Sequence, residues 1–211
     1  MLAQLTEMRV DVKVLLIGAT GTLGRSVHEA LRERGHDVLT ASRSDPELTV
    51  DITDPASIRS MYDKVGTVDA VASAAGSVPW RPLLQLSHQD VMDGLVGKAF
   101  SQVELVRQGS ARLADNGSFT LITGVLARDQ VATGALSALA NGAVESFVRA
   151  AAIELSRGHR INAVSPTVFV ESLADYGDTF AGFDPVPVRR AANAYLKSIE
   201  GRQTGQIYVV E

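Results

Sequence analysis

Near the start of the chain, Gly18, Gly21 and Gly24 have the spacing of a phosphate-binding turn. They follow a β-branched run at residues 12–17 and precede a helical pattern at 25–34. Gly18 would permit a tight turn, Gly21 would let the backbone approach a pyrophosphate, and Gly24 would let the helix pack closely on the strand. A helix N-terminus here would direct N–H groups and partial positive charge at the anion. We therefore expect a dinucleotide site, the alternative being a turn that binds nothing. The predicted contacts of this turn are Gly18, Thr20, Gly21, Thr22, Leu23 and Gly24.

The residues about 20 positions further on predict which dinucleotide is bound. Sites selective for NAD place a carboxylate there, at the end of the second strand, to accept hydrogen bonds from the ribose. This chain has Ser42, Arg43 and Ser44 instead. A guanidinium with two hydroxyls beside it suits a 2′-phosphate, so we expect NADP(H) in preference to NAD(H). Two alternatives remain: Arg43 is only a solvated loop residue, or Asp45 turns into the site. Arg25 is a second, weaker candidate for the same phosphate.

The rest of the chain must supply a sheet that carries this turn. Short β-branched runs alternate with helical patterns, which predicts an α/β fold: a Rossmann-type doubly wound parallel sheet of about seven strands with helices on both faces. A flavodoxin-like sheet is the competing topology, but its five strands would leave the residues after Gly158 unused. We expect one NAD(P)-binding domain over residues 1–211. The strand patterns lie at 12–17, 38–41, 68–72, 118–123, 161–164 and 207–210, and the helix patterns at 25–34, 55–64, 88–113, 134–156 and 189–198.

Local signals place several ends of these elements. Gly35 is expected to end the first helix, and Asp54 followed by proline to begin the second. Ser87 and Asp90 form a candidate capping box at the head of the long helix from 88 to 113. The pair at 116–117, Asn-Gly, predicts a turn before the next strand.

Composition excludes several kinds of partner. The chain has 24 acidic and 20 basic residues, a net charge of -4 and no cysteine. It therefore lacks the basic surface that nucleic acid or an anionic membrane requires, and it has no thiol chemistry. The first ten residues contain Glu7 and Arg9 and no apolar signal region, so we expect a cytoplasmic protein that is neither exported nor inserted in a membrane. We expect no metal site, because His28, His36, His88 and His159 are scattered without ligand spacing.

Five segments together resemble the short-chain dehydrogenase/reductase family, in the same order along nearly the whole chain. They are the glycine turn, Asp51-Ile52, Ser73-Ala74-Ala75-Gly76, the segment 162–166 followed by Thr167, and the Thr-Gly-Gln at 204–206. The glycine spacing is that of divergent and extended members more than that of the commonest group. The resemblance implies further cofactor contacts from Asp51, Ile52, Ala74, Ala75, Gly76, Pro166, Thr167 and Val168.

The same resemblance locates the catalytic positions, and there this chain departs from the family. The family's Tyr-x-x-x-Lys pair falls on Ser137 and Asn141, its serine on Gly124 with Thr123 just before it, and its asparagine near Lys98. A serine hydroxyl is far less acidic than a phenol and cannot replace it without a base.

Two hypotheses follow from this departure. In the first, the protein is an oxidoreductase on a small carbonyl or alcohol with a non-standard site of Thr123, Ser137, Lys98 and Asn141. In it, Lys98 returns the missing positive charge and the hydroxyls orient a carbonyl. The alternative for these residues is that Lys98 points to solvent and Ser137 and Asn141 only pack or cap the helix. In the second hypothesis, the protein is a catalytically inactive NADP(H)-binding sensor or regulatory module.

Two further expectations concern surfaces. The helix at 134–156 is apolar almost all round, so a homodimer through it and the helix near 88–113 is plausible, as the resemblance also implies. Only a short segment separates Pro166 from the helix near 189, which predicts an open substrate side without a lid. Trp80 either lines the substrate pocket there or anchors its own loop.

Overall fold

The computed structural model describes residues 11–211, so the expectation about the first ten residues lies outside it. Six parallel strands form one sheet in the order β2-β1-β3-β4-β5-β6. Their bounds are β1 Lys13–Ile17, β2 Asp37–Ala41, β3 Val68–Ser73, β4 Leu113–Ile122, β5 Arg160–Pro166 and β6 Ile207–Val210. The predicted α/β class with a doubly wound parallel sheet is confirmed.

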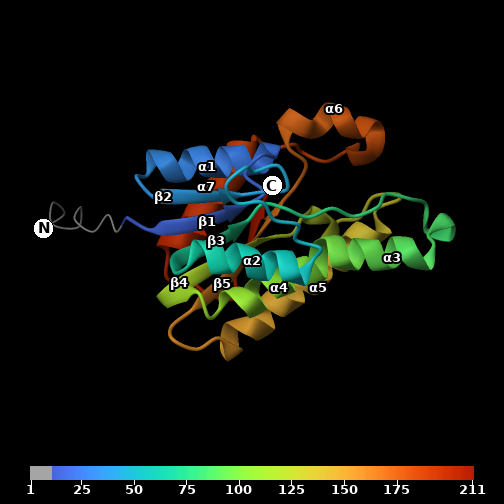
Figure 1. Cartoon of the computed structure of the whole chain (residues 1–211). Helices are drawn as coiled ribbons and strands as arrows, with labels where there is room; N and C mark the ends of the chain where they lie inside the picture. The colour runs from blue at the N-terminus through green and yellow to red at the C-terminus, as the bar shows by residue number, and fades with distance from the viewer. Residues whose placement is uncertain (1–10) are drawn as a thin grey trace, which may run out of the picture.

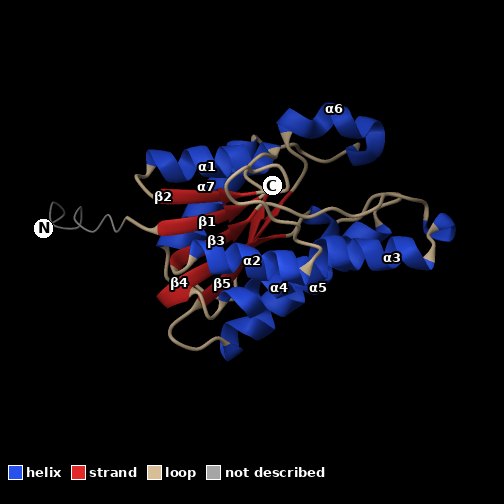
Figure 2. Ribbon diagram, viewed as in Figure 1, coloured by secondary structure: helices blue, strands red, loops and turns tan. Residues whose placement is uncertain are grey.

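Helices cover both faces of the sheet (Figures 1 and 2). One face carries α1 and α7, and the other carries α2, α4 and α5 (Figure 1). The bounds are α1 Thr22–Glu33, α2 Pro55–Val65, α3 His88–Gly94, α4 Ser101–Gly109, α5 Ala135–Glu154, α6 Leu173–Tyr176 and α7 Val188–Glu200. Each face has its own apolar core, because strands buried on both faces send alternate side chains to opposite sides.

The described sheet has six strands where about seven were expected. Beyond β2, a single parallel bridge joins Ser42 to Thr49, just before Asp51. The missing strand is thus reduced to one bridge at the sheet edge, and with that bridge counted the order is the Rossmann one that we preferred.

The predicted long helix from 88 to 113 is an unbroken helical segment, but it ends at Gly109 and its winding changes in the middle. The segment is α3, then a π-helix at Leu95–Phe100 that we label η2, then α4, and β4 begins at Leu113. A π-helix has wider i→i+5 turns, which periodicity does not reveal. The predicted Asn-Gly turn lies inside β4, where Asn116 has φ of 61° and the register with β3 shifts.

The helix-end predictions are confirmed. Gly35 has φ of +84°, the left-handed conformation of a residue that follows a helix. Asp54 accepts a hydrogen bond of 2.8 Å from the backbone N–H of Ala56, with Pro55 as the first residue of α2. Ser87 and Asp90 make the predicted capping box at the head of α3. Only α1 differs, because it begins at Thr22 directly after the turn.

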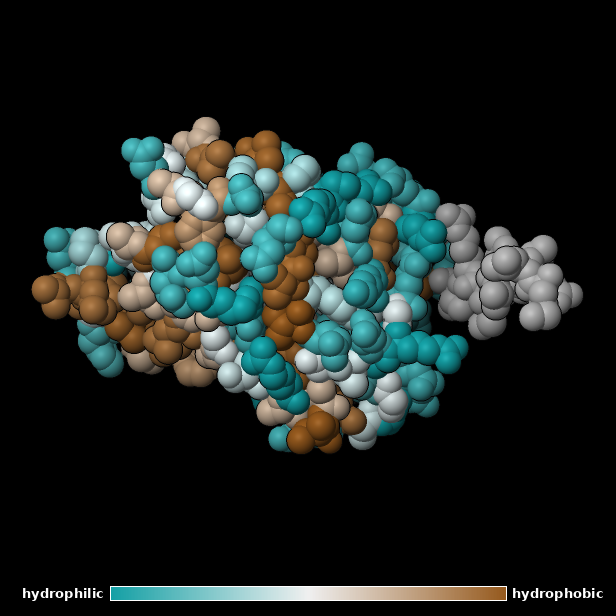
Figure 3. Space-filling model, turned by 180° about the vertical axis from the view of Figure 1, so that it is seen from behind, coloured by the Kyte–Doolittle hydropathy of each residue, from teal (hydrophilic) through white to brown (hydrophobic). Residues whose placement is uncertain are grey.

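The surface has exposed apolar side chains at several places. Figure 3 shows the face seen from behind, with brown residues at its left end and between teal ones elsewhere. Leu84 is 97% exposed in the short 3-10 helix η1 (Leu83–Gln85), and α5 exposes Leu139 and Ile153. The homodimer remains a prediction. Among residues 11–211, no helix has the length and apolarity to cross a membrane, and no group of metal-ligating side chains gathers.

Candidate functional site

Two cavities meet at the carboxyl ends of the strands. They lie next to β1 and β3, neighbouring strands after which the chain continues toward opposite edges of the sheet. One cavity, of about 500 Å³, lies over the glycine turn, and the other, of about 480 Å³, lies over β4 and β5. Ala74, Gly76 and Ser77 line both, so the two are parts of one cleft. Open α/β sheets bind ligands at such a crevice. We call the first the nucleotide cavity and the second the inner cavity.

The glycine turn has the geometry that its spacing predicts. Gly18 has φ of +84°, and a Cβ there would lie 2.8 Å from the Cβ of Ala75. A Cβ on Gly24 would overlap the carbonyl oxygen of Gly18, so only glycine lets α1 pack this closely on the turn. Gly21 stands at the head of α1, and a Cβ there would meet nothing nearer than 3.7 Å. The turn thus leaves room for an anion at a helix N-terminus.

The predicted nucleotide contacts divide between the two cavities. Gly18, Thr20, Gly21, Ser42, Arg43, Ser44, Asp51, Ile52, Ala74, Ala75 and Gly76 line the nucleotide cavity. Thr22, Leu23, Pro166, Thr167 and Val168 line the inner cavity, with Ala74 and Gly76 again. Gly24 acts through packing and lines neither.

Arg43 lies on the wall of the nucleotide cavity, and the carboxylates around it are held in place. Asp45 accepts hydrogen bonds from the backbone N–H groups of Glu47 and Leu48, both 3.0 Å, and from Thr40 Oγ1 at 2.8 Å. These bonds tie Asp45 to its own loop, and it is not among the residues lining the cavity. Arg25 donates to the carbonyl oxygen of Thr20.

Asp51 is the carboxylate that does line this cavity. Its Oδ1 accepts from Thr53 Oγ1 at 2.7 Å and from the Thr53 N–H at 2.9 Å. These bonds, with a smaller contribution from the positive charge of Arg43, lower the pKa of Asp51. It therefore stays ionised beside Arg43 near neutral pH.

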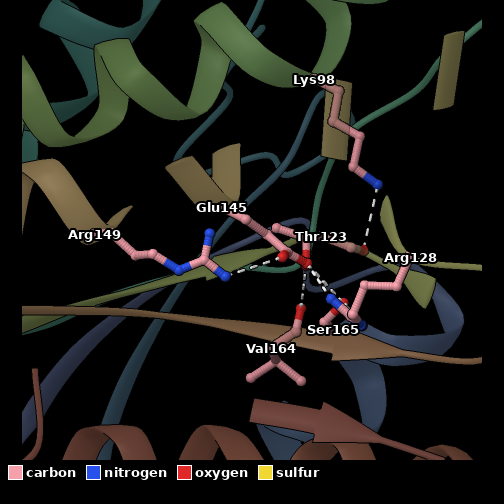
Figure 4. A network of polar contacts seen from close by, with 7 residues as sticks. All are labelled: Lys98, Thr123, Arg128, Glu145, Arg149, Val164 and Ser165. Carbon is pink, nitrogen blue, oxygen red and sulfur yellow. Dashed lines mark hydrogen bonds and ion pairs between the residues drawn. The ribbon is translucent and has the colours of Figure 1, made fainter. Parts of the chain in front are cut away.

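Lys98 reaches the inner cavity from η2. Its stem passes over Gly76, where a Cβ would lie 3.2 Å from Lys98 Cγ, and its Nζ donates to the carbonyl oxygen of Thr123 at 3.4 Å (Figure 4). Burial lowers the pKa of Lys98 to about 8. Of the described residues that line the inner cavity, Lys98 alone carries a charged side chain. The ammonium is therefore placed to interact with a bound polar group.

Ser137 and Asn141 lie one turn apart on the face of α5 that borders the inner cavity, and both are buried. Asn141 Oδ1 has no hydrogen-bond partner within the described part of the chain. A buried amide oxygen without a partner is costly, and a ligand in the cavity could satisfy it. Gly124 keeps this space open, since a Cβ there would lie 3.2 Å from Asn141 Nδ2. The structure thus brings Lys98, Ser137 and Asn141 to one cavity.

Thr123 is also at the cavity, but its hydroxyl is engaged elsewhere. Thr123 Oγ1 donates to Glu145 Oε1 at 3.2 Å, and Arg128 binds the same oxygen at 2.6 Å and Ser165 Oγ at 2.7 Å (Figure 4). Ser165 Oγ also donates to Glu145 Oε1 at 3.2 Å. Thr123 therefore offers the cavity its backbone carbonyl, which holds Lys98.

This network of Thr123, Arg128, Glu145 and Ser165 was not among the predicted site residues. It joins the loop after β4 to α5 and β5, so it fixes the wall of the inner cavity. One signal was present in the sequence. Glu145 follows Asn141 by four residues on the buried side of an apolar helix, and a carboxylate in that position needs a partner.

The short segment from which we expected an open substrate side is itself folded and borders the inner cavity. The segment after β5 folds into η4 (Val170–Ser172), α6 and η5 (Gly177–Phe180), and Tyr176 and Phe180 line the inner cavity with Trp80. Its backbone is anchored by a bridge between Phe169 and Val186. The segment is short, yet it forms a cap over the cavity, because its aromatic residues pack on one another and on Trp80.

Comparison with known proteins gives consistent matches over most of the chain. A family model described as Enoyl-(Acyl carrier protein) reductase matches residues 13–206. L-xylulose reductase of Mesocricetus auratus is 25% identical over 178 residues, which are 76% of this chain and 73% of that protein.

Solved structures agree with these matches. The Listeria innocua protein lin1944 has a TM-score of 0.92 and 47% identity, covering 94% of this chain and 99% of that one. A small-chain dehydrogenase in complex with NADPH has a TM-score of 0.85 and 24% identity, covering 96% and 97%, which shows a likeness of fold. The chain belongs to the short-chain dehydrogenase/reductase family, a family of oxidoreductases that bind nicotinamide cofactors.

Proposed function

We propose that the protein is an NADP(H)-dependent oxidoreductase of small carbonyl compounds or alcohols, in which Lys98 transfers the proton. The observation that carries this proposal is the position of Lys98 Nζ, inside the inner cavity and 3.4 Å from the Thr123 carbonyl oxygen. Its pKa, lowered by burial to about 8, leaves it protonated at neutral pH yet able to release that proton. This combines the charge and the acidity that the family's absent Tyr and Lys would provide.

The cleft fits a dinucleotide. The glycine turn leaves space where a Cβ would intrude, the head of α1 points N–H groups at that space, and the two cavities join end to end. The bound nicotinamide would supply or accept the hydride. Gly76, with the Lys98 stem above it, lies between the part of the cleft that suits a pyrophosphate and the part that suits a reacting group.

The preference for NADP(H) is supported by the residues around Arg43. A 2′-phosphate beside this guanidinium would also meet the hydroxyls of Ser42 and Ser44, which line the same cavity. Asp45, the carboxylate that could favour NAD(H) there, instead accepts hydrogen bonds from Thr40 and from the Leu48 N–H of its own loop. Asp51 remains as an acidic neighbour, at the part of the cavity that suits adenine.

In reduction, the chain's own groups would act as follows. Asn141 and Ser137 orient the substrate's polar group from α5, and Lys98 lines the same cavity. Lys98 Nζ gives its proton to the oxygen that becomes the hydroxyl, and solvent returns a proton to the amine. In oxidation of an alcohol, neutral Lys98 takes the hydroxyl proton instead. The Thr123 carbonyl holds the amine in place in both directions.

Two titrations and one rate comparison test the proposal. Arg43→Ala should weaken NADPH binding by about tenfold to a hundredfold, with NADH binding nearly unchanged. Lys98→Met should lower kcat by about 10² to 10⁴, with NADPH still bound, because proton transfer is lost. Lys98→Arg is the matched control: it keeps the charge but cannot release a proton near neutral pH, so it should not restore the rate.

The outcomes separate the proposal from its alternative. Tight NADPH binding without turnover across a panel of aldehydes and ketones would favour an inactive NADP(H)-binding sensor. Absence of binding of either cofactor at micromolar concentrations would contradict the cofactor assignment itself.

A further inference from the structure

The cap over the inner cavity is built from aromatic rings that come from two distant segments. Trp80 lies in the loop after β3, and Tyr176, Phe180 and Phe183 lie in the cap. The ring centroids of Trp80 and Tyr176 are 6.2 Å apart, those of Trp80 and Phe180 6.4 Å, and those of Tyr176 and Phe180 5.1 Å. Phe183 supports Phe180 from behind, with its ring 5.3 Å away. We call Trp80, Tyr176 and Phe180 the aromatic cluster.

The aromatic cluster still has ring surface available for a ligand. Trp80 is 40% exposed and Tyr176 39%, whereas Phe180 is 8% exposed and holds the cluster to the protein. All three line the inner cavity, which Lys98, Ser137 and Asn141 also line. Figure 1 shows α6 at the same end of the molecule as α3, beyond the sheet. The cavity therefore offers aromatic faces together with a small set of polar groups.

The charged side chains of the cap are all acidic. Residues 167–188 include Glu171, Asp175, Asp178 and Asp184 and no lysine, arginine or histidine. All four carboxylates are exposed. A concentration of negative charge on the cap disfavours the approach of anions and has little effect on neutral molecules. Inside the cavity, Lys98 disfavours a cationic group. The cap and Lys98 thus act on opposite signs of charge, and a neutral molecule is the one that neither of them repels.

We propose that the aromatic cluster is the specificity element of the inner cavity and that it selects a neutral, planar, aromatic carbonyl compound. The ring of the substrate would pack on Trp80 and Tyr176, and its carbonyl oxygen would lie toward Lys98 and Asn141. Offset and edge-to-face aromatic pairs favour a planar ring over a saturated one of equal size. The placement of the carbonyl oxygen toward Lys98 rests on the proposed function. The preference for an aromatic ring concerns binding alone and does not require that the ligand react.

The test uses ligands that bind without reacting. Benzamide and cyclohexanecarboxamide have nearly the same size and the same amide group, but only benzamide is planar and aromatic. Calorimetry on the full chain, with and without saturating NADP⁺, should show benzamide bound about fivefold to tenfold more tightly. The chain has one tryptophan, so benzamide should also change Trp80 fluorescence. 4-Carboxybenzamide, the anionic analogue, should bind more weakly than benzamide.

Variants of Tyr176 locate the preference. Tyr176→Leu should remove most of the preference for benzamide, whereas Tyr176→Phe, which keeps the ring, should retain it. Trp80→Leu is a second variant for calorimetry, should Tyr176→Leu fail to fold. Equal binding of the two neutral amides to the wild type, binding of neither, or a preference that survives both ring-removing variants would overturn the proposal.

Turnover is measured separately, with acetophenone and cyclohexyl methyl ketone as the reducible pair. Selective benzamide binding without reduction of acetophenone would leave the aromatic cluster supported and would contradict the proposed function. Reduction of both ketones at equal kcat/KM, together with equal binding of both amides, would contradict the cluster alone.

Discussion

The two cavities of the cleft differ in whether backbone or side-chain atoms determine their shape. The nucleotide cavity is shaped mostly by backbone: Gly18 and Gly21 give it room, and α1 gives it N–H groups. The inner cavity is shaped by side chains from distant segments, among them Lys98, Asn141 and Tyr176. A backbone-built site keeps its shape when surrounding side chains change. A side-chain-built site can keep its cavity while its catalytic residues change, and this chain has Ser137 and Asn141 at the positions where we expect the family's Tyr-x-x-x-Lys pair.

The largest expected effect comes from adding a side chain to the glycine turn of the nucleotide cavity. Gly24→Ala would force its Cβ against the Gly18 carbonyl, so α1 must move away from the turn. We expect a loss of about 3 to 4 kcal/mol in the free energy of unfolding, with NADPH binding abolished. Urea denaturation and an NADPH titration measure the two effects.

Gly21→Ala is the matched control for that substitution. Its Cβ meets nothing nearer than 3.7 Å, so the fold should be nearly unaffected while NADPH binds more weakly. Equal stability losses at the two glycines would contradict the distinction between a packing glycine and a ligand-facing glycine.

The second prediction concerns a substitution in the wall of the inner cavity. Glu145→Ala leaves Arg128 without its carboxylate and removes the acceptor of the Thr123 and Ser165 hydroxyls. We expect about 2 to 3 kcal/mol of lost stability, less than for a fully buried pair, because the Arg128 side chain is 36% exposed. Cofactor binding should change little, since the network borders the inner cavity. Arg149→Ala, whose guanidinium is 59% exposed and 3.5 Å from Glu145, should cost less than about 0.5 kcal/mol.

The third prediction concerns pH. Reduction needs protonated Lys98, whose pKa is lowered to about 8. The kcat/KM for reduction should therefore be constant below about pH 8 and fall about tenfold per unit above it. Oxidation of the alcohol should show the opposite dependence and level off above that pH. A profile that shows no change near pH 8 in the wild type, or the same change in Lys98→Met, would exclude Lys98 as the proton donor.

The smallest effect tests whether the nucleotide cavity depends on the side chain that supports the loop next to Arg43. Asp45→Ala removes the acceptor for Glu47 N–H, Leu48 N–H and the Thr40 hydroxyl. We expect a loss of about 1 kcal/mol in stability and a few-fold weaker NADPH binding, because the loop next to Arg43 loses its support. Thermal unfolding and titration measure both. An unchanged NADPH affinity would mean that Arg43 does not depend on the hydrogen bonds of Asp45 for its position.

Local patterns were sufficient for most of the fold. The strand runs, the glycine turn and the caps at Asp54 and Ser87 each depend on a few neighbouring residues, and the structure confirms them. The errors arose where structure depends on distant contacts. The edge strand near Thr49 is too short to pair beyond one bridge, and the helix from 88 changes its winding at η2.

The site residues also divide into those that a local pattern predicts and those that depend on distant contacts. Most of the residues predicted to contact the cofactor line the nucleotide cavity, since glycine and helix-start signals are local. The partnership of Arg128 with Glu145 joins positions 17 residues apart across a loop, and Trp80 meets Tyr176 across nearly half the chain. Neither contact has a local pattern. Even Thr123, correctly placed at the cavity, turns its hydroxyl to a partner that only the tertiary structure reveals.

The π-helix η2 has a consequence for how such a site arises in evolution. Residues along an α-helix are separated by about 100° of rotation, so deleting one residue from Leu95–Phe100 would turn part of the helix by that angle. Depending on which side of Lys98 the deletion fell, the lysine would rotate out of the cavity or the flanking helix would be displaced. A single-codon insertion or deletion is therefore enough to give this cleft its positive charge or to remove it, with no substitution among the residues that line it.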